Sequence, residues 1–202
     1  MTRPNPGGRP IDASGAPKLM AAARELINRQ GYAGVTIAMI ADAAGVGRQM
    51  VYRRWRSKAE LVLDAYLDHA HRPAADDLGT VRDTLEAFLN KVFRELEEDG
   101  QAVRSLIAEA QVDDDFRANL DQRFARPRSQ IVLEILKHGA STGELPEELD
   151  VELIAELIHG AYWYRLIVGR PLDGEFAKRL VNVTLRPRIT PGNITEISDN
   201  NE

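Results

Sequence analysis

Apolar residues recur along most of the chain at the three- and four-residue spacing of helices that bury one face. The first such stripe predicts a helix over residues 16–30 that ends at Gly31. Comparable stripes predict further helices over 37–44, 47–54, 58–71, 80–98, 101–111, 113–139, 151–168 and 174–185. Within 113–139, Pro127 should kink the helix or make it restart. We therefore predict an all-α fold of about nine helices.

The stretch from Thr36 to Leu61 has the pattern of two short helices joined by a turn. The Thr36 hydroxyl can cap the first helix, and Gly45 can end it in a left-handed backbone conformation. Val46 supplies the apolar residue of the turn before a second helix over 47–54. Two helices joined by a short turn with glycine form the helix-turn-helix unit. In that unit the start of the second helix meets base edges in the major groove of DNA.

The run TIAMIADAAGVGRQMVYRRWRSKAEL resembles the N-terminal domain of the TetR family of bacterial transcriptional regulators. The resemblance is strong over residues 18–67, and a second good match covers 143–172. Two positions depart from the family pattern: Gly47 stands where serine is usual, and Arg54 where histidine is frequent. Both departures leave the operator sequence open. The resemblance implies a three-helix DNA-binding domain, followed by a helical domain for effector binding and dimerisation.

The second helix of this unit divides into buried and DNA-facing positions. Val51 and Trp55 lie four residues apart and should belong to the core. Arg48 and Gln49 are the expected base readers, since arginine pairs bidentately with guanine and glutamine with adenine. Met50 could touch a thymine methyl group or fill a gap in the packing. The resemblance assigns DNA contacts to Tyr52 and a phosphate contact to Lys58. The predicted DNA-binding set is Thr36, Gly47, Arg48, Gln49, Met50, Tyr52, Arg53, Arg54 and Lys58.

Charge is divided unevenly along the chain. Residues 1–60 contain ten basic and four acidic residues, a net charge of +6, whereas the whole chain has a net charge of −5. Residues 61–202 therefore carry −11. A basic N-terminal part on an acidic remainder favours orientation of the basic part toward a polyanion. Ordinary variation of surface charge is the alternative, but the basic block coincides with the helix-turn-helix.

Four segments are predicted from these patterns. Residues 1–15 are rich in proline and glycine and should form a disordered arm, although Arg3 and Arg9 could reach a minor groove. Residues 16–60 should form the DNA-binding domain, and residues 61–186 the effector-binding and dimerisation domain. Residues 187–202 contain few apolar side chains and should form a disordered tail.

The resemblance also implies an effector pocket and a dimer interface in the helical body. The predicted pocket residues, for which plain core packing is the alternative, are Phe88, Val92, Leu106, Phe116, Phe124 and Trp163. Glu109 and Arg165 would be polar anchors there only if they are buried. The last two predicted helices carry more apolar surface than one intramolecular face needs, which indicates a partner. The predicted dimer interface consists of Ile154, Ala155, Ile158, Ala161, Tyr162, Phe176 and Leu180.

Several classes of protein and site are disfavoured. The chain has no cysteine, which excludes disulfides, thiolate zinc sites and cysteine nucleophiles. Asp113, Asp114 and Asp115 fit an acidic helix N-terminus better than a metal site. No apolar run approaches the ~18 residues of a membrane span, and residues 1–15 do not resemble a secretion signal. We expect no metal, cofactor or membrane and a cytoplasmic location.

The predicted function is that of a homodimeric repressor, released from a palindromic double-stranded operator by a small hydrophobic ligand. Two alternatives keep the fold: an activator, or a repressor controlled by a protein partner. An enzyme is disfavoured because the four histidines are scattered and no nucleophile motif is present.

Overall fold

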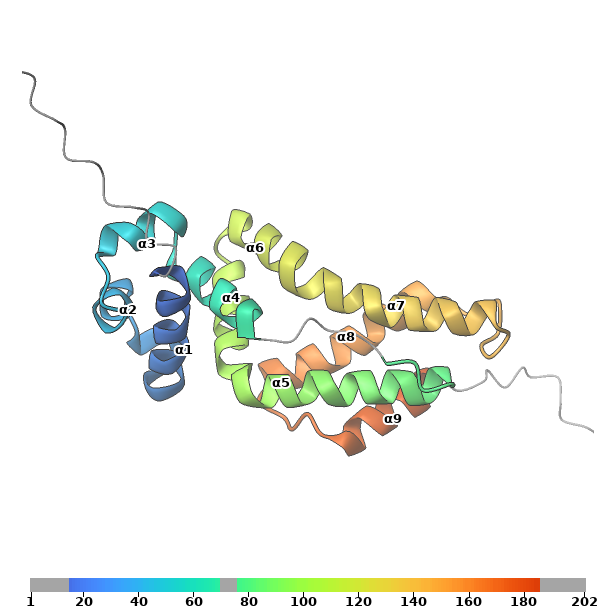
Figure 1. Cartoon of the computed structure of the whole chain (residues 1–202). Coiled ribbons are helices and arrows are strands. Elements are labelled where there is room, and N and C mark those ends of the chain that lie inside the picture. Colours follow the sequence, from blue (N-terminus) through green and yellow to red (C-terminus); the bar gives the residue numbers. More distant parts are fainter. Residues whose placement is uncertain (1–14, 70–75, 186–202) are drawn as a thin grey trace, which may run out of the picture.

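The computed structural model describes residues 15–69 and 76–185, and every regular element within those ranges is helical (Figure 1). The elements are α1 (Gly15–Gly34), α2 (Ile37–Ala43), α3 (Arg48–Arg54), α4 (Lys58–His69), α5 (Val81–Ala110), α6 (Asp114–Leu120), the π-helical segment η1 (Asp121–Ala125), α7 (Arg126–Ser141), α8 (Val151–Ile167) and α9 (Gly174–Thr184). The all-α prediction is confirmed. The predicted tail, most of the predicted arm and the predicted end of the 58–71 helix lie outside the described residues.

Helices α1, α2 and α3 form the head of the molecule, at one end in Figure 1. The Thr36 hydroxyl oxygen accepts a hydrogen bond from the Met39 amide at 3.2 Å, which begins α2 as predicted. Gly45 then has φ 67°, a left-handed conformation that glycine adopts without steric cost. Leu19 of α1, Ile40 of α2 and Val51 of α3 are fully buried, so the three helices share one small core.

Helix α4 joins the head to the body, which consists of α5 to α9. Ser57 and Glu60 form a reciprocal cap at its start: the Glu60 amide donates to the Ser57 hydroxyl at 3.2 Å, and the Glu60 carboxylate accepts from the Arg56 amide at 2.7 Å. Leu61, Leu63 and most of the other apolar side chains of α4 are buried, because the helix packs against α1 on one side and against α5 and α6 on the other. The head therefore rests on the body through α4.

Helix α5 is continuous, and the prediction of separate helices over 80–98 and 101–111 was wrong. Gly100 lies inside α5 with helical geometry, facing α8: a Cβ atom there would lie 3.3 Å from Leu166 Cδ1. A glycine in a helix interior costs about 1 kcal/mol relative to alanine. Burial of Leu96, Val103 and Leu106 on the same helix outweighs that cost, because each such side chain contributes about 1.5–3 kcal/mol.

The predicted irregularity near Pro127 is present as a π-helical segment just before it. The Arg126 amide bonds to the carbonyl of Asp121, five residues back, instead of four. A proline ring clashes with the carbonyl four residues before it in a regular helix, and a locally wider turn relieves such a clash. Helices α6 and α7 thus follow one another through η1, with Phe124 of that segment buried.

Candidate nucleic-acid interface

The second helix of the head, α3, has one buried and one exposed face. Val51 and Trp55 are 0% and 2% exposed, as predicted for core positions. Tyr52 is 61% exposed. The polar side chains that share the solvent-facing surface of α3 belong to Arg48, Gln49, Arg53 and Arg54. This surface offers positive charge for phosphates together with side chains that can hydrogen-bond to base edges.

Nothing within the head holds Arg48 firmly. Its Nη2 atom lies 3.9 Å from the Asp42 carboxylate, and both side chains are well exposed. Exposed ion pairs of this kind contribute about 0–1 kcal/mol. Gly47, the residue before Arg48, has ordinary extended geometry, and a Cβ atom added to it would lie more than 4 Å from every other residue in the described ranges except its chain neighbours. The N-terminus of α3 is therefore sterically open on the side of Gly47, and Arg48 is free to turn toward a ligand.

Met50 of α3 is half-buried, and its side chain packs against the start of α1. Its sulfur atom lies so close to Gly15 that a Cβ atom at that position would collide with it. Of the two predicted roles for Met50, this packing supports the gap-filling one. Its expected contact with DNA remains a prediction.

Lys58 is held by the head itself. Its ammonium group donates to the carbonyls of Tyr32 at 2.8 Å and Val35 at 2.9 Å, and lies 3.9 Å above the centre of the Tyr32 ring. Burial lowers the pKa of Lys58, an effect that the nearby Glu109 carboxylate opposes. Lys58 thus ties the start of α4 to the connection between α1 and α2. The predicted phosphate contact of Lys58 stays a prediction, for which one of its three N–H donors remains available.

Asp64 of α4 connects α3 to the body. One of its carboxylate oxygens accepts a hydrogen bond from Trp55 Nε1 at 2.7 Å, and the other accepts from Arg123 Nη2 at 2.7 Å. Trp55 is the C-cap of α3, and Arg123 belongs to η1. One carboxylate therefore couples the position of the DNA-facing helix to the π-helical segment of the body.

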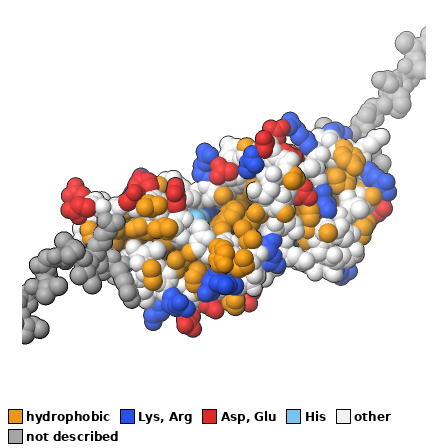
Figure 2. Space-filling model, turned by 180° about the vertical axis from the view of Figure 1, so that it is seen from behind, with side chains coloured by type: hydrophobic (Ala, Val, Ile, Leu, Met, Phe, Trp, Pro, Cys, Tyr) orange, Lys and Arg blue, Asp and Glu red, His pale blue; other side chains and the backbone are white. Residues whose placement is uncertain are grey.

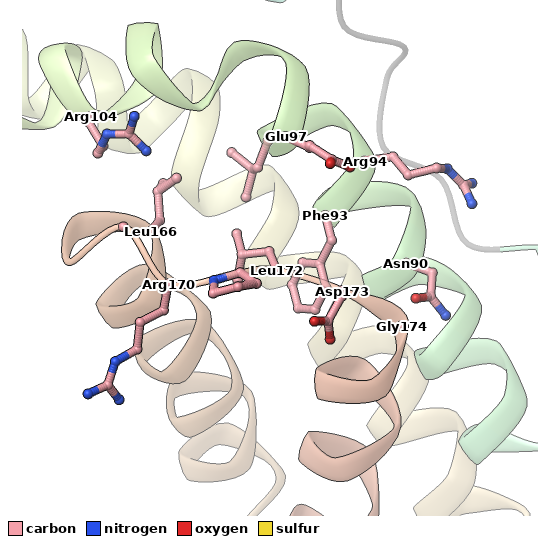
Figure 3. Close-up of a pocket in the computed structure, with 13 residues that line it drawn as sticks. Asn90, Phe93, Arg94, Glu97, Arg104, Leu166, Arg170, Leu172, Asp173 and Gly174 are labelled. Atoms are coloured by element: carbon pink, nitrogen blue, oxygen red, sulfur yellow. The ribbon is translucent and has the colours of Figure 1, made fainter.

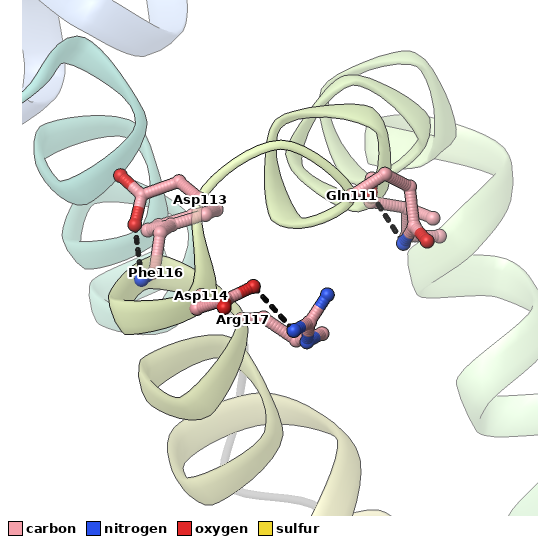
Figure 4. Close-up of polar contacts among 6 residues, drawn as sticks. Gln111, Asp113, Asp114, Phe116 and Arg117 are labelled. Atoms are coloured by element: carbon pink, nitrogen blue, oxygen red, sulfur yellow. Dashed lines mark hydrogen bonds and ion pairs between the residues drawn. The ribbon is translucent and has the colours of Figure 1, made fainter.

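The three aspartates lie at the start of α6: Asp113 is its N-cap, and Asp114 and Asp115 belong to its first turn. Figure 4 shows the contacts of Asp113 and Asp114. Asp113 accepts a hydrogen bond from the Phe116 amide at 2.9 Å and caps α6, while Asp114 pairs with Arg117. This is the predicted acidic helix start. In the described ranges, no group of three or more histidine, aspartate or glutamate side chains is arranged to hold a metal ion.

The predicted pocket residues are packed into the core of the body. Phe88, Val92, Leu106, Phe116 and Phe124 are at most 3% exposed, and Trp163 is half-buried with its ring 6.3 Å from that of Phe124. Neither suggested anchor is buried among them. Half-buried Glu109 lies beside Tyr32, whose pKa is raised by burial and by this carboxylate, and Arg165 donates to the Pro171 carbonyl at 2.7 Å. The effector pocket stays a prediction.

A cavity of about 620 Å³ lies elsewhere, between α5 and the connection from α8 to α9 (Figure 3). None of the six predicted pocket residues lines it. Phe93 and Leu172 supply apolar walls, and Arg104 and Glu97 supply charges of both signs. The side chains of Arg94 and Arg170 extend outward from it in Figure 3. The mixture indicates no single class of ligand.

Sequence reasoning missed a buried arginine in the body. Arg128 of α7 is 3% exposed and lies 3.5 Å from the Glu95 carboxylate of α5. Its signal in the sequence was its place in an apolar stripe, four residues after Phe124 and four before Val132. A charged residue at such a position is either paired and buried or marks a functional site.

The predicted dimer set requires a correction. Ile154, Ala155, Ile158 and Tyr162 are buried within a single protomer, so they belong to its own core. The exposed apolar residues of α8 lie on the opposite face, because the helix is apolar on both sides. Six of the nine large hydrophobic side chains exposed in the described part of the chain lie on α8, its C-cap or α9: Leu153, Leu157, Tyr164, Ile167, Val168 and Val183.

Figure 2 shows hydrophobic side chains gathered on the body of the molecule, seen from behind. Ala161, Phe176 and Leu180 from the predicted set are half-buried, so parts of them remain accessible. Within residues 15–69 and 76–185, no helix is long and apolar enough to cross a membrane.

Both the head and the body of the chain match known protein families. Residues 19–65 match the family model of bacterial regulatory proteins of the tetR family, and residues 75–184 match the tetracyclin repressor-like C-terminal domain. The chain is 30% identical to the HTH-type transcriptional regulator YdeS of Bacillus subtilis, over 86% of this chain and 89% of that protein. It is 29% identical to the DNA-binding transcriptional repressor TetR of Mycobacteroides abscessus, over 86% and 93% of the two chains.

Solved structures agree with these matches. The TetR family transcription regulator SCO0332 superposes with a TM-score of 0.67 at 29% identity, covering 83% of this chain and 94% of that one. The regulator FadR from Bacillus subtilis, solved in complex with stearoyl-CoA, gives a TM-score of 0.63 at 18% identity, over 83% and 96% of the two chains. At that identity the likeness to FadR shows the fold alone.

Proposed function

Because the chain belongs to the TetR family of bacterial transcriptional regulators, we propose that it is a homodimeric repressor that a small molecule releases from a palindromic operator. Binding of DNA by a helix-turn-helix is the general activity of the family. The observation that carries the proposal is the division of α3 into a buried face with Val51 and Trp55 and an exposed face with Arg48, Gln49 and Tyr52. Acting on chromosomal DNA, the protein would work in the cytoplasm.

Arg48 and Gln49 are the proposed base readers, because the N-terminal residues of such a helix reach base edges first. Arg53 and Arg54 lie in the last turn and would neutralise phosphates. Tyr52 has an exposed ring and hydroxyl between these two groups, and would contact phosphate or base. Thr36 is exposed at the start of α2, where it would contact the DNA backbone.

The exposed stripe of α8 is the proposed dimer contact, in place of the four residues buried within the protomer. Its members follow a 4-3-4-3 spacing, which is that of helices packed side by side: Leu153, Leu157, Gly160, Tyr164 and Ile167. Gly160 lies in the middle of the stripe, and a Cβ atom there would meet no atom of the described residues within 4 Å. A second copy of α8 could therefore approach closely at Gly160. Phe176, Leu180 and Ala161 would lie at the margin of this contact.

Control by a small molecule is supported by two observations. The structure of FadR shows that a protein of this fold binds an acyl-CoA. In the present chain, Asp64 provides a physical route from the body to α3 through Arg123 and Trp55. A ligand can shift the equilibrium between DNA-bound and released protein only if it binds one arrangement of the Arg123, Asp64 and Trp55 contacts better than another.

The test is selection of genomic fragments with the purified protein, followed by footprinting at two salt concentrations. We expect a protected palindrome and lower affinity at higher salt, because phosphate contacts release counterions. Arg48→Ala and Gln49→Ala should change the base preference at particular operator positions, with a cost of about 1–3 kcal/mol for each lost bidentate contact. Arg117→Ala, which removes an exposed arginine of the body, is the matched control and should leave binding unchanged. Uniform binding without a protected palindrome would contradict the proposal.

The repressor role requires a separate measurement. A reporter promoter that carries the selected operator should lose activity when the protein is expressed and recover it with Arg48→Ala. Increased reporter activity with the wild-type protein would show an activator instead.

A further inference from the structure

Helices α4, α5, α7 and α8 enclose a group of buried polar atoms that lack hydrogen-bond partners. Among the described residues, the group comprises Arg128 Nε and Nη2, Glu95 Oε2 and His159 Nε2, together with the Tyr66 hydroxyl, which lies near enough to Arg128 for a weak hydrogen bond between the two to offset slightly the rise that burial causes in the Tyr66 pKa. Buried polar atoms in native proteins are nearly always satisfied, so several unpaired atoms in one place require an explanation. They all lie close to Arg128, whose charge influences the pKa of both Tyr66 and His159.

The free edge of Arg128 has a specific geometry. Its Nη1 atom donates to the Phe124 carbonyl at 3.1 Å, and its guanidinium lies 4.1 Å from the centre of the Phe124 ring. The unpaired Nε and Nη2 atoms carry the two N–H bonds that run parallel along one edge of a guanidinium. That edge is the fork that binds a carboxylate bidentately.

Glu95 balances the charge of Arg128 without filling this fork. Its Oε2 atom lies 3.5 Å from Arg128 Nη2, and the two form no hydrogen bond. The Glu95 side chain is 19% exposed, whereas that of Arg128 is 3% exposed. Glu95 Oε2 is buried against Nη2 alone, so among the described residues Arg128 Nε has no hydrogen-bond partner and the fork is not filled bidentately.

Apart from Glu95, the side chains packed around the fork are mainly aromatic. Tyr66 and Phe124 pack edge to face with ring centres 5.4 Å apart, and Trp163 lies 6.3 Å from Phe124. Burial raises the pKa of Tyr66 to about 12, so its hydroxyl keeps its proton and can donate. His159 Nδ1 lies 2.9 Å from the Ala155 carbonyl, and burial lowers its pKa, so the ring is neutral with Nε2 as an acceptor.

We propose that Arg128 is the anchor for an effector with a carboxylate group and an apolar, aryl or acyl, body. The inference rests on the proposed ligand-controlled function and names the chemical class of the ligand. The carboxylate occupies the Nε–Nη2 fork, and the apolar body displaces side-chain packing among Phe124, Trp163 and Tyr66. Trp163 is half-buried, whereas Tyr66 and Phe124 are 3% exposed, so the ligand enters from the side of Trp163. Among the residues predicted from sequence, Phe124 and Trp163 belong to this site.

The test measures binding of four probes to the full-length protein by calorimetry: benzoate and octanoate, with benzamide and octanamide as neutral controls of matched shape. We expect each carboxylate to bind at least tenfold more tightly than its amide. The double variant Arg128→Met, Glu95→Gln removes the buried pair together, because a single substitution would leave one charge unpaired. In that variant the preference for carboxylates should disappear, whereas Arg126→Ala, an exposed arginine on the same helix, should retain it.

A second variant keeps the test informative if the double variant fails to fold. Glu95→Gln leaves the buried charge of Arg128 without its partner and should lower the thermal unfolding temperature; octanoate, but not octanamide, should restore it, because the bound carboxylate replaces Glu95. Equal binding of amides and carboxylates, or no binding of any probe at millimolar concentration, would overturn the proposal and leave Arg128 and Glu95 as a structural ion pair. Operator footprinting of the same preparations separates the proposed ligand class from the proposed DNA-binding function. A protected palindrome without carboxylate binding refutes only the proposed ligand class. Carboxylate binding without a protected palindrome refutes only the proposed binding to a palindromic operator.

Discussion

Asp64→Asn is the substitution that best tests the connection between head and body. The carboxylate of Asp64 accepts one hydrogen bond from Trp55 Nε1 and one from Arg123 Nη2, both at 2.7 Å. An asparagine has the same shape but only one acceptor oxygen, so its amide NH2 group must face one of the two donors. The lower-cost orientation keeps the oxygen on the buried Trp55, so Arg123 loses its partner and the bond to Trp55 loses its charged acceptor.

The magnitude follows from the burial of the two donors. Trp55 is 2% exposed, and a hydrogen bond to a charged acceptor contributes about 1.5–3 kcal/mol, against about 0.5–1.5 kcal/mol for a neutral one. The Arg123 side chain is 42% exposed, so water replaces its lost partner and the cost is about 0.2–1 kcal/mol. We expect Asp64→Asn to reduce the free energy of unfolding by about 1–2 kcal/mol, of which about 1 kcal/mol comes from the weaker bond to Trp55 and the rest from Arg123.

The assay is chemical denaturation followed by fluorescence, with Arg123→Ala as the matched single change. Arg123→Ala leaves the bond to Trp55 intact and should cost no more than about 1 kcal/mol. Operator affinity should fall more with Asp64→Asn than with Arg123→Ala, because only the former weakens the bond to Trp55, the C-cap residue of α3. Equal effects of the two substitutions on stability and operator affinity would refute the reasoning that the bond to Trp55 dominates.

Three further substitutions test other parts of the structure. Leu157→Glu on the exposed stripe should leave the fold intact but raise the dissociation constant of the dimer, measured by sedimentation, at least about tenfold, because each protomer loses apolar contact and gains an interface charge. An unchanged dissociation constant would contradict the proposed contact. Gly47→Ser should change the free energy of unfolding by only a few tenths of a kcal/mol, because glycine and serine are both good N-caps. The added hydroxyl donor should raise operator affinity in titrations. Reduced affinity would show that DNA needs the open space at Gly47. Gly139→Ala should lower the free energy of unfolding by about 1–3 kcal/mol despite the helix preference of alanine, because its Cβ atom would collide with Val81 and lie 3.1 Å from Leu145 Cδ1; a more stable variant in thermal unfolding would contradict this packing.

The head could be predicted from sequence because its signals are local. Thr36 caps α2 through an atom three residues away, and Gly45 supplies the left-handed turn. The four-residue spacing of Val51 and Trp55 identified their buried face, and the charged residues around them identified the exposed one. These features depend on neighbours within one or two helical turns, so the sequence contains them directly.

The body shows what local signals do not contain. Gly100 resembled a helix boundary, but it marks a close contact with α8 from the middle of α5. Helix α8 is apolar on both sides, so its pattern showed a surplus of apolar surface without showing which face the protomer buries.

The sequence by itself therefore determined the helical fold class, the family and the DNA-facing helix. Only the tertiary structure decided which face of α8 is exposed and which polar groups are buried around Arg128. The physical reason is that caps, turns and periodicity act between residues close in the chain, whereas burial depends on distant segments. For Arg128, those segments are α4, α5 and α8, which bring Tyr66, Glu95 and His159 to it.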